Sequence, residues 1–297
     1  MTAAPVPLDA TPVRPLAVIG AGSLARTLLA GWRRAGIPFP SVLTVSRRAA
    51  RAAELSDPGV TALSIEDDEA ATARAVRGAG IVVLAVKPWM LDEVAAQIAG
   101  ALEPGAIVVS VMAGVRLEAL RAALGGSNPI VRALPNTPSQ VNAGIAGLAV
   151  GDAGPVAVAI VRELFGALGD VIEVDEDGLD ALTVLSVSGP ALVFLLAEKL
   201  AAAAEHQGFA PDTASRIARG VLAGAGALVA ATGEDPEELR RRVTSVQGVT
   251  HYAVSVLEER DLGGMVIASA DAGLARAREL ATAAAPIPGP PTSGETP

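Results

Sequence analysis

A glycine-rich turn near the start of the chain has the residue types and spacing needed to hold a pyrophosphate. The turn, Gly20-Ala21-Gly22-Ser23-Leu24-Ala25, follows the apolar run Leu16–Ile19 and opens the helical run Leu24–Ala35. Gly20 permits a tight bend and Gly22 lets the backbone approach phosphate oxygens, while the helix N-terminus supplies N–H donors and positive potential. The pattern predicts a dinucleotide cofactor. The residues expected to contact it are Gly20, Gly22, Ser23 and Leu24.

The end of the next apolar run indicates which dinucleotide is bound. An NAD site places a carboxylate there, which accepts hydrogen bonds from the adenosine ribose hydroxyls. This chain instead has Ser46, Arg47 and Arg48, a hydroxyl followed by two guanidinium groups. Because a guanidinium donates paired, charge-assisted hydrogen bonds, these residues favour the 2′-phosphate of NADPH over NADH. The alternative is that Arg47 and Arg48 are solvated charges at a helix start.

A third candidate segment is Val86-Lys87-Pro88. The run Ile81–Val86 is apolar at every position, which predicts a central strand buried on both faces. Parallel sheets bind ligands at the carboxyl ends of their strands, so Val86, Lys87 and Pro88 are expected beside the cofactor. The alternative is that Lys87 is a surface lysine at the end of a strand.

Two kinds of segment divide the chain into an α/β part and a helical part. From Pro15 to Asp175, β-branched runs alternate with Ala/Leu/Arg-rich stretches, a pattern typical of a parallel sheet covered by helices. The expected strands are Leu16–Ile19, Val42–Ser46, Ile81–Val86, Ile107–Val111, Ile130–Ala133 and Val171–Val174. After Gly178 helical patterns take over, at Leu179–His206, Asp212–Ala231, Pro236–Val243, Val249–Glu259 and Gly264–Ala283. We therefore expect a Rossmann-type dinucleotide-binding domain followed by an all-helical dimerisation domain.

The expected domain boundaries follow from composition. They are a disordered leader at 1–14, an NADP-binding domain at 15–178, a helical dimerisation and substrate domain at 179–283, and a disordered tail at 284–297. Segments Leu192–Ala204 and Gly220–Gly233 are nearly as apolar as a protein interior, and one small bundle cannot cover them. A homodimer is the expected explanation. Ala181–Ala197 is near the lower limit for a membrane span, but its serines, Gly189 and Pro190 favour a helix buried in an oligomer.

Composition excludes several classes of site. The 297 residues include no cysteine and two histidines, so no disulfide, thiol nucleophile, Cys-ligated metal or multi-histidine metal site is expected. A net charge of -9 gives no general attraction to nucleic acid or anionic lipid. The N-terminal residues show no secretory signal, and together with the lack of cysteine this favours a cytoplasmic protein that binds a small molecule.

Several motifs occur in order along the chain, over roughly Pro15 to Leu280. They are Gly20–Ala25, Ala85-Val86-Lys87-Pro88, Val131-Arg132-Ala133-Leu134-Pro135-Asn136-Thr137-Pro138 with Gly144, Ser186-Val187-Ser188-Gly189-Pro190-Ala191, and Val243-Thr244-Ser245-Val246-Gln247-Gly248-Val249-Thr250. Together these motifs resemble the pyrroline-5-carboxylate reductase family. The resemblance implies NAD(P)H-driven reduction of the cyclic imine 1-pyrroline-5-carboxylate to L-proline, as in proline biosynthesis. It also implies a helical domain that dimerises by interlocking, with dimers often assembling further.

The same resemblance implies roles for individual residues. Thr250 would hydrogen-bond the substrate near its ring nitrogen and is the candidate catalytic residue, unless it is a helix cap. Asn136 would meet the nicotinamide or substrate side and is assigned to cofactor binding, unless it is a turn residue. The candidate substrate-binding residues are Ser188, Gly189, Ser245, Gly248, Val249 and Thr250.

The chain departs from the family pattern around the substrate. Val187 and Leu192 replace a glycine and an aromatic residue, while Val246 and Gln247 replace a proline and a glycine. Because glycine readily takes positive φ and Gln247 resists it, the loop is expected to differ in shape. Two alternatives therefore stay open: the same chemistry on a six-membered or substituted cyclic imine acid, or a non-catalytic NADP-binding regulator. A β-hydroxyacid dehydrogenase is disfavoured, because Lys199 lies too far beyond Gly189 to match its lysine motif.

Overall fold

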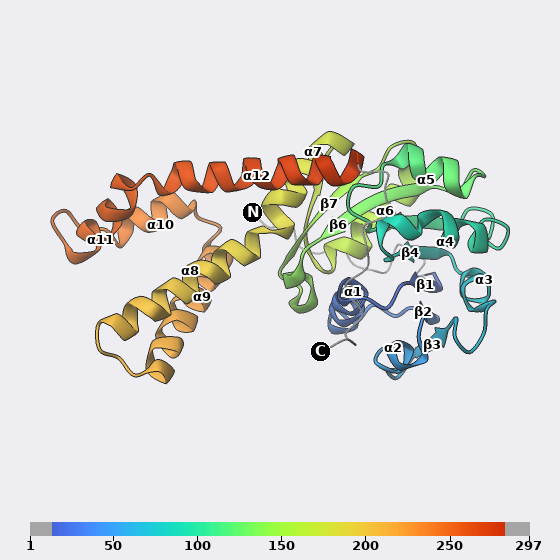
Figure 1. Ribbon diagram of the computed structural model, residues 1–297, viewed down its shortest axis with the longest axis horizontal. Helices are drawn as coiled ribbons and strands as arrows, with labels where there is room; N and C mark the ends of the chain where they lie inside the picture. Colours follow the sequence, from blue (N-terminus) through green and yellow to red (C-terminus); the bar gives the residue numbers. More distant parts are fainter. Residues whose placement is uncertain (1–13, 283–297) are drawn as a thin grey trace, which may run out of the picture. The chain divides into compact units, whose positions relative to one another are not determined.

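The computed structural model describes residues 14–282 (Figure 1). The expected leader, apart from Arg14, and the expected tail lie outside these residues. Contacts group the described chain into two units: residues 14–187 with 274–282, which we call the sheet unit, and Ser188–Gly273, which we call the helical unit. The expected boundary at residue 178 falls before this division.

The sheet unit is built on an eight-stranded sheet with the order β3-β2-β1-β4-β5-β6-β7-β8. Strands β1 to β6 are parallel, whereas β7 runs antiparallel to β6 and β8 runs parallel to β7. The crossover between β1 and β4 is the switch point at which such sheets bind ligands. The strands are β1 Leu16–Ile19, β2 Val42–Ser46, β3 Val60–Ser64, β4 Ile81–Leu84, β5 Ile107–Ser110, β6 Ile130–Pro135, β7 Gly144–Ala149 and β8 Gly169–Glu173.

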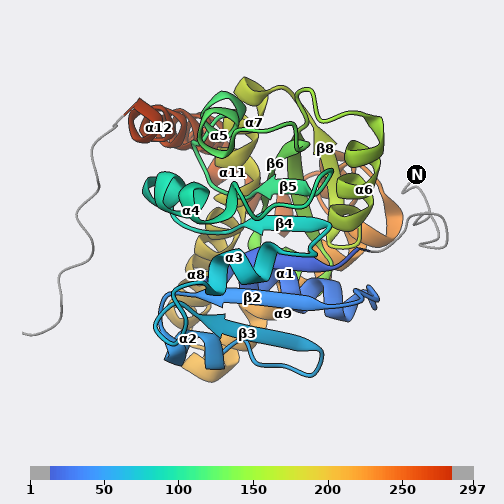
Figure 2. The ribbon, with the colours of Figure 1, turned by 90° about the vertical axis from the view of Figure 1, so that its right-hand side faces the viewer.

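Helices cover both faces of this sheet (Figure 2). On one face, α1 (Ser23–Arg34) and α6 (Pro155–Gly166) pack on alternate strand residues. There Trp32 Nε1 donates to the Leu164 carbonyl at 2.9 Å, and its ring meets Phe165 edge-on. On the other face lie α3 (Ala71–Val76), α4 (Leu91–Ile98) and α5 (Leu117–Leu124). Further short helices of this unit are α2 (Ala49–Ala53), η2 (Pro88–Met90) and η3 (Thr137–Val141).

The strand predictions are confirmed at β1 and β2, and need correction elsewhere. Strand β4 ends at Leu84 rather than Val86, because the Ala85 N–H makes the last bond to the ladder, at Ile19 O, before the chain turns away. Strands β3 and β7 were not predicted. Strand β7 is glycine-rich because neighbours approach it closely: a Cβ at Gly147 would lie 2.6 Å from Leu179 Cδ1.

The segment predicted as one helix, Leu179–His206, falls within three consecutive helical elements. These are α7 (Glu176–Leu182), a π turn η4 (Thr183–Val187), and α8 (Gly189–His206). Leu179 is buried with Leu134 and Ala149 of the sheet. Because of this packing, α7 groups with the sheet unit, and the division by contacts comes after Val187.

The helical unit contains α8, α9 (Pro211–Thr232), α10 (Pro236–Arg242), α11 (Val249–Glu259) and most of α12 (Leu262–Thr282). Helices α8 and α9 lie side by side, running in opposite directions (Figure 1). Of its described residues only Ala204, Ala214 and Ala218 are buried. Many large apolar side chains are exposed instead, among them Leu192, Val193, Phe194, Leu195, Leu196, Val221, Leu228, Met265, Val266 and Ile267.

The segments Glu176–His206 and Pro211–Thr232 are long and apolar enough to cross a membrane by length and composition. Helices packed between subunits have the same character. The exposed apolar faces indicate that the unit needs a partner surface, since so much apolar area is costly to leave in water.

Candidate active site

The glycine-rich turn has the geometry that a pyrophosphate requires. Gly20 has φ +114°, and a Cβ there would lie 2.5 Å from the Ala85 carbonyl oxygen. Gly22 is the N-cap of α1, and nothing lies within 4 Å of the position of its missing Cβ. The first turn of α1 contains no acidic residue and no side-chain cap, and Ser23 is exposed. The backbone donors of this helix N-terminus are therefore open to an anion.

Strands β1, β2 and β4 bring the cofactor candidates to one edge of the sheet. Ile19 pairs with Val45 on one side and with Leu84 on the other. Because of this register, Gly20, Ser46 and Ala85, the next residue after each of these three, lie side by side at the carboxyl ends of the parallel strands. The sequence prediction that these three segments lie together is consistent with this register.

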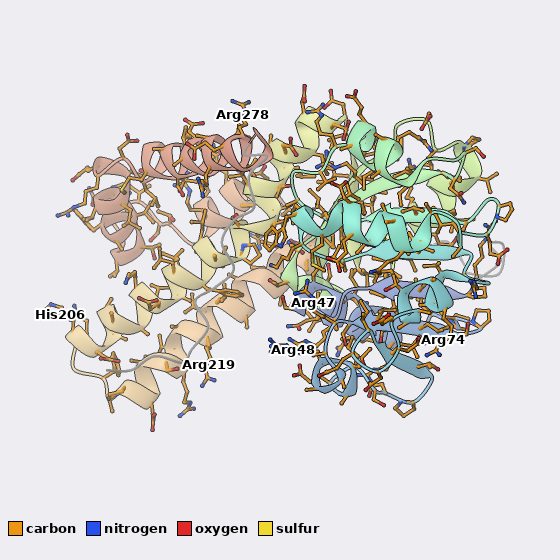
Figure 3. All side chains as sticks on the ribbon, turned by 45° about the vertical axis from the view of Figure 1, so that its right-hand side comes forward. Arg47, Arg48, Arg74, His206, Arg219 and Arg278 are labelled. Carbon is orange, nitrogen blue, oxygen red and sulfur yellow. The ribbon has the colours of Figure 1, made fainter. Side chains whose placement is uncertain are left out.

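The residues after β2 differ in what they offer a ligand. Ser46 is buried, and its Oγ donates to the Arg48 carbonyl at 2.8 Å, so this hydroxyl shapes the turn. Arg47 and Arg48 are exposed (Figure 3), and the Nη2 of Arg47 lies 3.7 Å from Met90 Sδ. Arg48 makes no side-chain hydrogen bond or ion pair with the described residues. Both guanidinium groups remain able to bind a phosphate.

Sequence reasoning missed Glu66, which lies just after the unpredicted strand β3. Its Oε2 accepts a hydrogen bond from the Ala49 N–H at 2.8 Å, and its own N–H donates to Arg47 O. Glu66 thus fixes the backbone of the arginine turn. Glu66 could have been identified as an acidic residue directly after a strand, but only if β3 had been predicted.

Lys87 lies beyond the end of β4 and precedes η2, which begins at Pro88. It is exposed, and its ammonium group makes no ion pair with the described residues. Val86 beside it is half-buried. Contact of these residues with a cofactor stays a prediction.

Asn136 follows β6 and is buried, with 5% of its surface exposed. Its Oδ1 accepts a hydrogen bond from the Ile145 N–H at 2.9 Å, and its Nδ2 donates to the Ser186 carbonyl at 2.9 Å. The side chain therefore joins two backbone segments of the sheet unit. Its expected contact with the nicotinamide or substrate stays a prediction.

The substrate candidates all lie in the helical unit. Ser188 is the N-cap of α8, and Gly189 is that helix's first residue. Gly248, not Thr250, is the N-cap of α11; Thr250 is its second residue, and the Thr250 hydroxyl makes no hydrogen bond within the described chain. The first turn of α11 has no acidic residue and no side-chain cap. Its N–H groups and the Thr250 hydroxyl are free to bind a carboxylate or an imine nitrogen.

The expectation that the loop before α11 changes shape needs correction at one residue. Gln247 adopts φ 59°, the left-handed conformation that a glycine would take. The Gly248 N–H donates to Ser245 O at 2.9 Å, which closes the turn and holds this conformation. Ser245, Val246 and Val249 are exposed around it. Gln247 therefore adopts a positive φ, which glycine takes readily, despite its side chain.

Two family models match the chain. One is described as pyrroline-5-carboxylate reductase dimerisation and covers residues 176–280; the other, NADP oxidoreductase coenzyme F420-dependent, covers residues 15–114. Together these matches cover much of both units.

Curated relatives and solved structures agree with these models. The pyrroline-5-carboxylate reductase of Pseudomonas aeruginosa is 34% identical over 268 residues, 90% of this chain and 96% of that protein. The Pisum sativum enzyme is 32% identical, over 89% of this chain and 95% of that protein. The structure of the Coxiella burnetii pyrroline-5-carboxylate reductase has a TM-score of 0.81 and 31% identity, and the match covers 90% of this chain and 98% of that one. The family resemblance of the motifs is confirmed: this chain belongs to the pyrroline-5-carboxylate reductase family.

Proposed function

We propose that the protein reduces 1-pyrroline-5-carboxylate to L-proline with NADPH. The observation that carries the proposal is the open glycine turn at Gly20 and Gly22, set beside two exposed arginines at one sheet edge, in a chain of this family. The comparisons give no support to the six-membered-ring alternative or to a non-catalytic regulator.

The cofactor is assigned to the carboxyl edge of the sheet. Backbone N–H groups at Gly22, Ser23 and Leu24 bind the pyrophosphate, with Gly20 leaving room for the turn. Arg47 and Arg48 bind the 2′-phosphate, on a turn held by Ser46 and Glu66. Val86, Lys87 and Pro88, just after β4, would contact the same cofactor. The matching NADP oxidoreductase model covers these residues, and a Plasmodium falciparum relative with the same fold was solved with NADP bound.

The substrate is assigned to the loop and helix start around Gly248. The N–H groups of Val249 and Thr250, just after the N-cap Gly248, hold the substrate carboxylate, and the Thr250 hydroxyl hydrogen-bonds near the ring nitrogen. Ser188, Gly189 and Ser245 complete the polar lining. When bound, NADPH supplies the hydride. A protonated imine is already electrophilic, so the residues contribute chiefly by holding the reacting carbon in line and by excluding water.

The active protein is assigned as a homodimer that assembles through the helical unit. The matching dimerisation model covers residues 176–280, which include the helices with exposed apolar faces. A second copy of the chain covers these faces. The cytoplasmic location expected from the sequence stays a prediction.

A steady-state assay tests the function directly. NADPH consumption is followed with 1-pyrroline-5-carboxylate, with the six-membered imine acid, and with no imine. We expect the five-membered substrate to give the highest kcat/KM. Thr250→Val keeps the side-chain volume and removes the hydroxyl, and the loss of about 1–3 kcal/mol lowers kcat/KM roughly 5- to 150-fold without weakening NADPH binding. A preference for the larger ring, or full activity in the variant, would contradict these assignments.

A further inference from the structure

The chain leaves the sheet unit through α7 and η4, residues Glu176–Val187, which we call the connecting segment. Two side chains from the region of β6 bind it near its two ends. Arg132 Nη1 donates to Glu176 Oε1 at 2.8 Å, and its Nη2 lies 3.3 Å from Asp180 Oδ1. Asn136 Nδ2 donates to the Ser186 carbonyl at 2.9 Å. The connecting segment is thus held at its first turn and at its last.

The first of these contacts is made by a buried charged side chain, that of Arg132. The Arg132 side chain is 0% exposed, and a buried guanidinium must be paired because its hydration is lost. Both of its carboxylate partners lie on α7. Arg116 adds a second cation there, and its hydrogen bond to Asp177 at 2.9 Å raises the pKa of Arg116 above its ordinary value. The start of the connecting segment is anchored by charge.

The second contact depends on the orientation of one amide. The Asn136 amide oxygen accepts from the Ile145 N–H, and its nitrogen donates to the Ser186 carbonyl. If the amide were flipped, donor would face donor and acceptor would face acceptor, so both hydrogen bonds would be lost. Ser186 is buried, and its hydroxyl has no hydrogen-bond partner in the described chain. The carbonyl contact with Asn136 therefore links the end of this π turn to the loop after β6. Single π turns are often found at functional sites.

We propose that Asn136 is a positioning residue for substrate binding. By holding the Ser186 carbonyl, it fixes the backbone that continues through Val187 into Ser188 and Gly189. The proposal rests on the proposed function, because that function assigns Ser188 and Gly189 to the imine acid. It gives Asn136 an effect on the substrate through the connecting segment, in place of a direct contact with the nicotinamide.

The test compares the same substitution at two asparagines near the same turn. Asn136→Asp keeps the shape and the acceptor for Ile145, but sets a carboxylate oxygen against the Ser186 carbonyl. Asn142→Asp is the matched control: Asn142 Nδ2 donates to the carbonyls of Gly31 and Ala167, not to the connecting segment. Both variants lose hydrogen bonds to carbonyls and are expected to lower the thermal midpoint.

Only Asn136→Asp is expected to raise the KM for 1-pyrroline-5-carboxylate, by about tenfold or more, with the NADPH Kd within about twofold of wild type. Burial raises the pKa of the new carboxyl group, so lowering the pH protonates it and restores a donor. The KM ratio of variant to wild type should therefore fall as the pH falls. A parallel rise in NADPH Kd, an unchanged KM, or the same KM effect in Asn142→Asp would overturn the proposal.

Hydrogen exchange gives a readout that does not depend on catalysis. Amides of residues 183–189 should exchange faster in Asn136→Asp than in Asn142→Asp, even if the wild-type protein reduces a different imine. If Asn136→Asp does not fold, Asn136→Ala removes the same amide donor without adding a charge. It should raise the same KM severalfold without changing the NADPH Kd. Unchanged exchange and an unchanged KM in the Asn136 variant that folds would refute the role of the Asn136–Ser186 contact.

Discussion

The carbonyl oxygen of Ala85 lies 2.5 Å from the place that a Cβ on residue 20 would occupy, so Gly20 has no room for a side chain. Gly22 has nothing within 4 Å of the corresponding position. The two glycines of the turn therefore have different reasons to be glycine. Gly20 is required by the fold, whereas Gly22 leaves a space that a ligand can fill.

This difference predicts opposite results for two identical substitutions. Gly20→Ala forces a Cβ against backbone at a φ that side chains rarely adopt, and it should destabilise the protein by at least about 2 kcal/mol. Gly22→Ala should leave the midpoint of urea unfolding unchanged but weaken NADPH binding about tenfold or more, measured by fluorescence titration. Equal NADPH affinity in Gly22→Ala would show that the pyrophosphate lies elsewhere.

The arginine turn predicts cofactor preference. Replacing both Arg47 and Arg48 with Ala removes charge-assisted contacts to the 2′-phosphate, each worth about 1.5–3 kcal/mol. The KM for NADPH should rise at least about tenfold while the KM for NADH stays nearly unchanged. Arg74→Ala is the matched control, because Arg74 is also exposed but pairs with Asp68. Equal losses with both cofactors would argue against the 2′-phosphate assignment.

The loop before α11 predicts a stability effect. Gln247 holds a left-handed conformation that costs most side chains roughly 1–2 kcal/mol. Gln247→Gly removes this cost, but the glycine also raises the conformational entropy of the unfolded chain, which offsets part of the gain. The free energy of unfolding should therefore change by less than about 1 kcal/mol. Gln247→Val, which is β-branched, should be destabilising. The urea midpoints of the wild type and both variants, measured at one protein concentration, test this order of stability. A Gln247→Val variant more stable than the wild type would contradict it.

The exposed helices predict an assembly. Phe194 on α8 is 59% exposed in the single chain, and Val156 on α6 of the sheet unit is 68% exposed. If a second copy covers α8, Phe194→Asp should shift the protein toward monomer in sedimentation experiments, whereas Val156→Asp should not. A wild-type protein that is monomeric while active would contradict the homodimer.

The residue pattern was sufficient to predict β1 and β2, which carry the candidate cofactor residues. Their runs are mostly β-branched or apolar, and they end at Ile19, just before Gly20, and at Ser46, so their bounds and the edge they share follow from the sequence. Strand β7 escaped prediction because Gly144 and Gly147 replace the usual β-branched residues where other backbone and side chains pack closely. The break between α7 and α8 does have a sequence signal, because Ser188, Gly189 and Pro190 interrupt the apolar run where α8 begins. The π turn before the break has none, since an apolar pattern does not distinguish α from π turns.

Long-range polar contacts were beyond the sequence. Arg132 belongs to one of the family motifs, but its carboxylate partners on α7 lie far along the chain, and only the fold brings them to it. The same holds for Asn136, whose partner Ser186 comes from another element. The positive φ of Gln247 is set by the turn that the Gly248 N–H closes on Ser245, which outweighs the local preference of glutamine.

The most direct measurement follows the transferred hydrogen. NADPH that carries deuterium at both positions of nicotinamide C4 is incubated with the protein and 1-pyrroline-5-carboxylate, and the product is analysed by mass spectrometry and NMR. The proposed function predicts L-proline carrying one deuterium on the ring carbon that formed the C=N bond. Recovery of unlabelled proline, or of no proline while NADPH is bound, would contradict it.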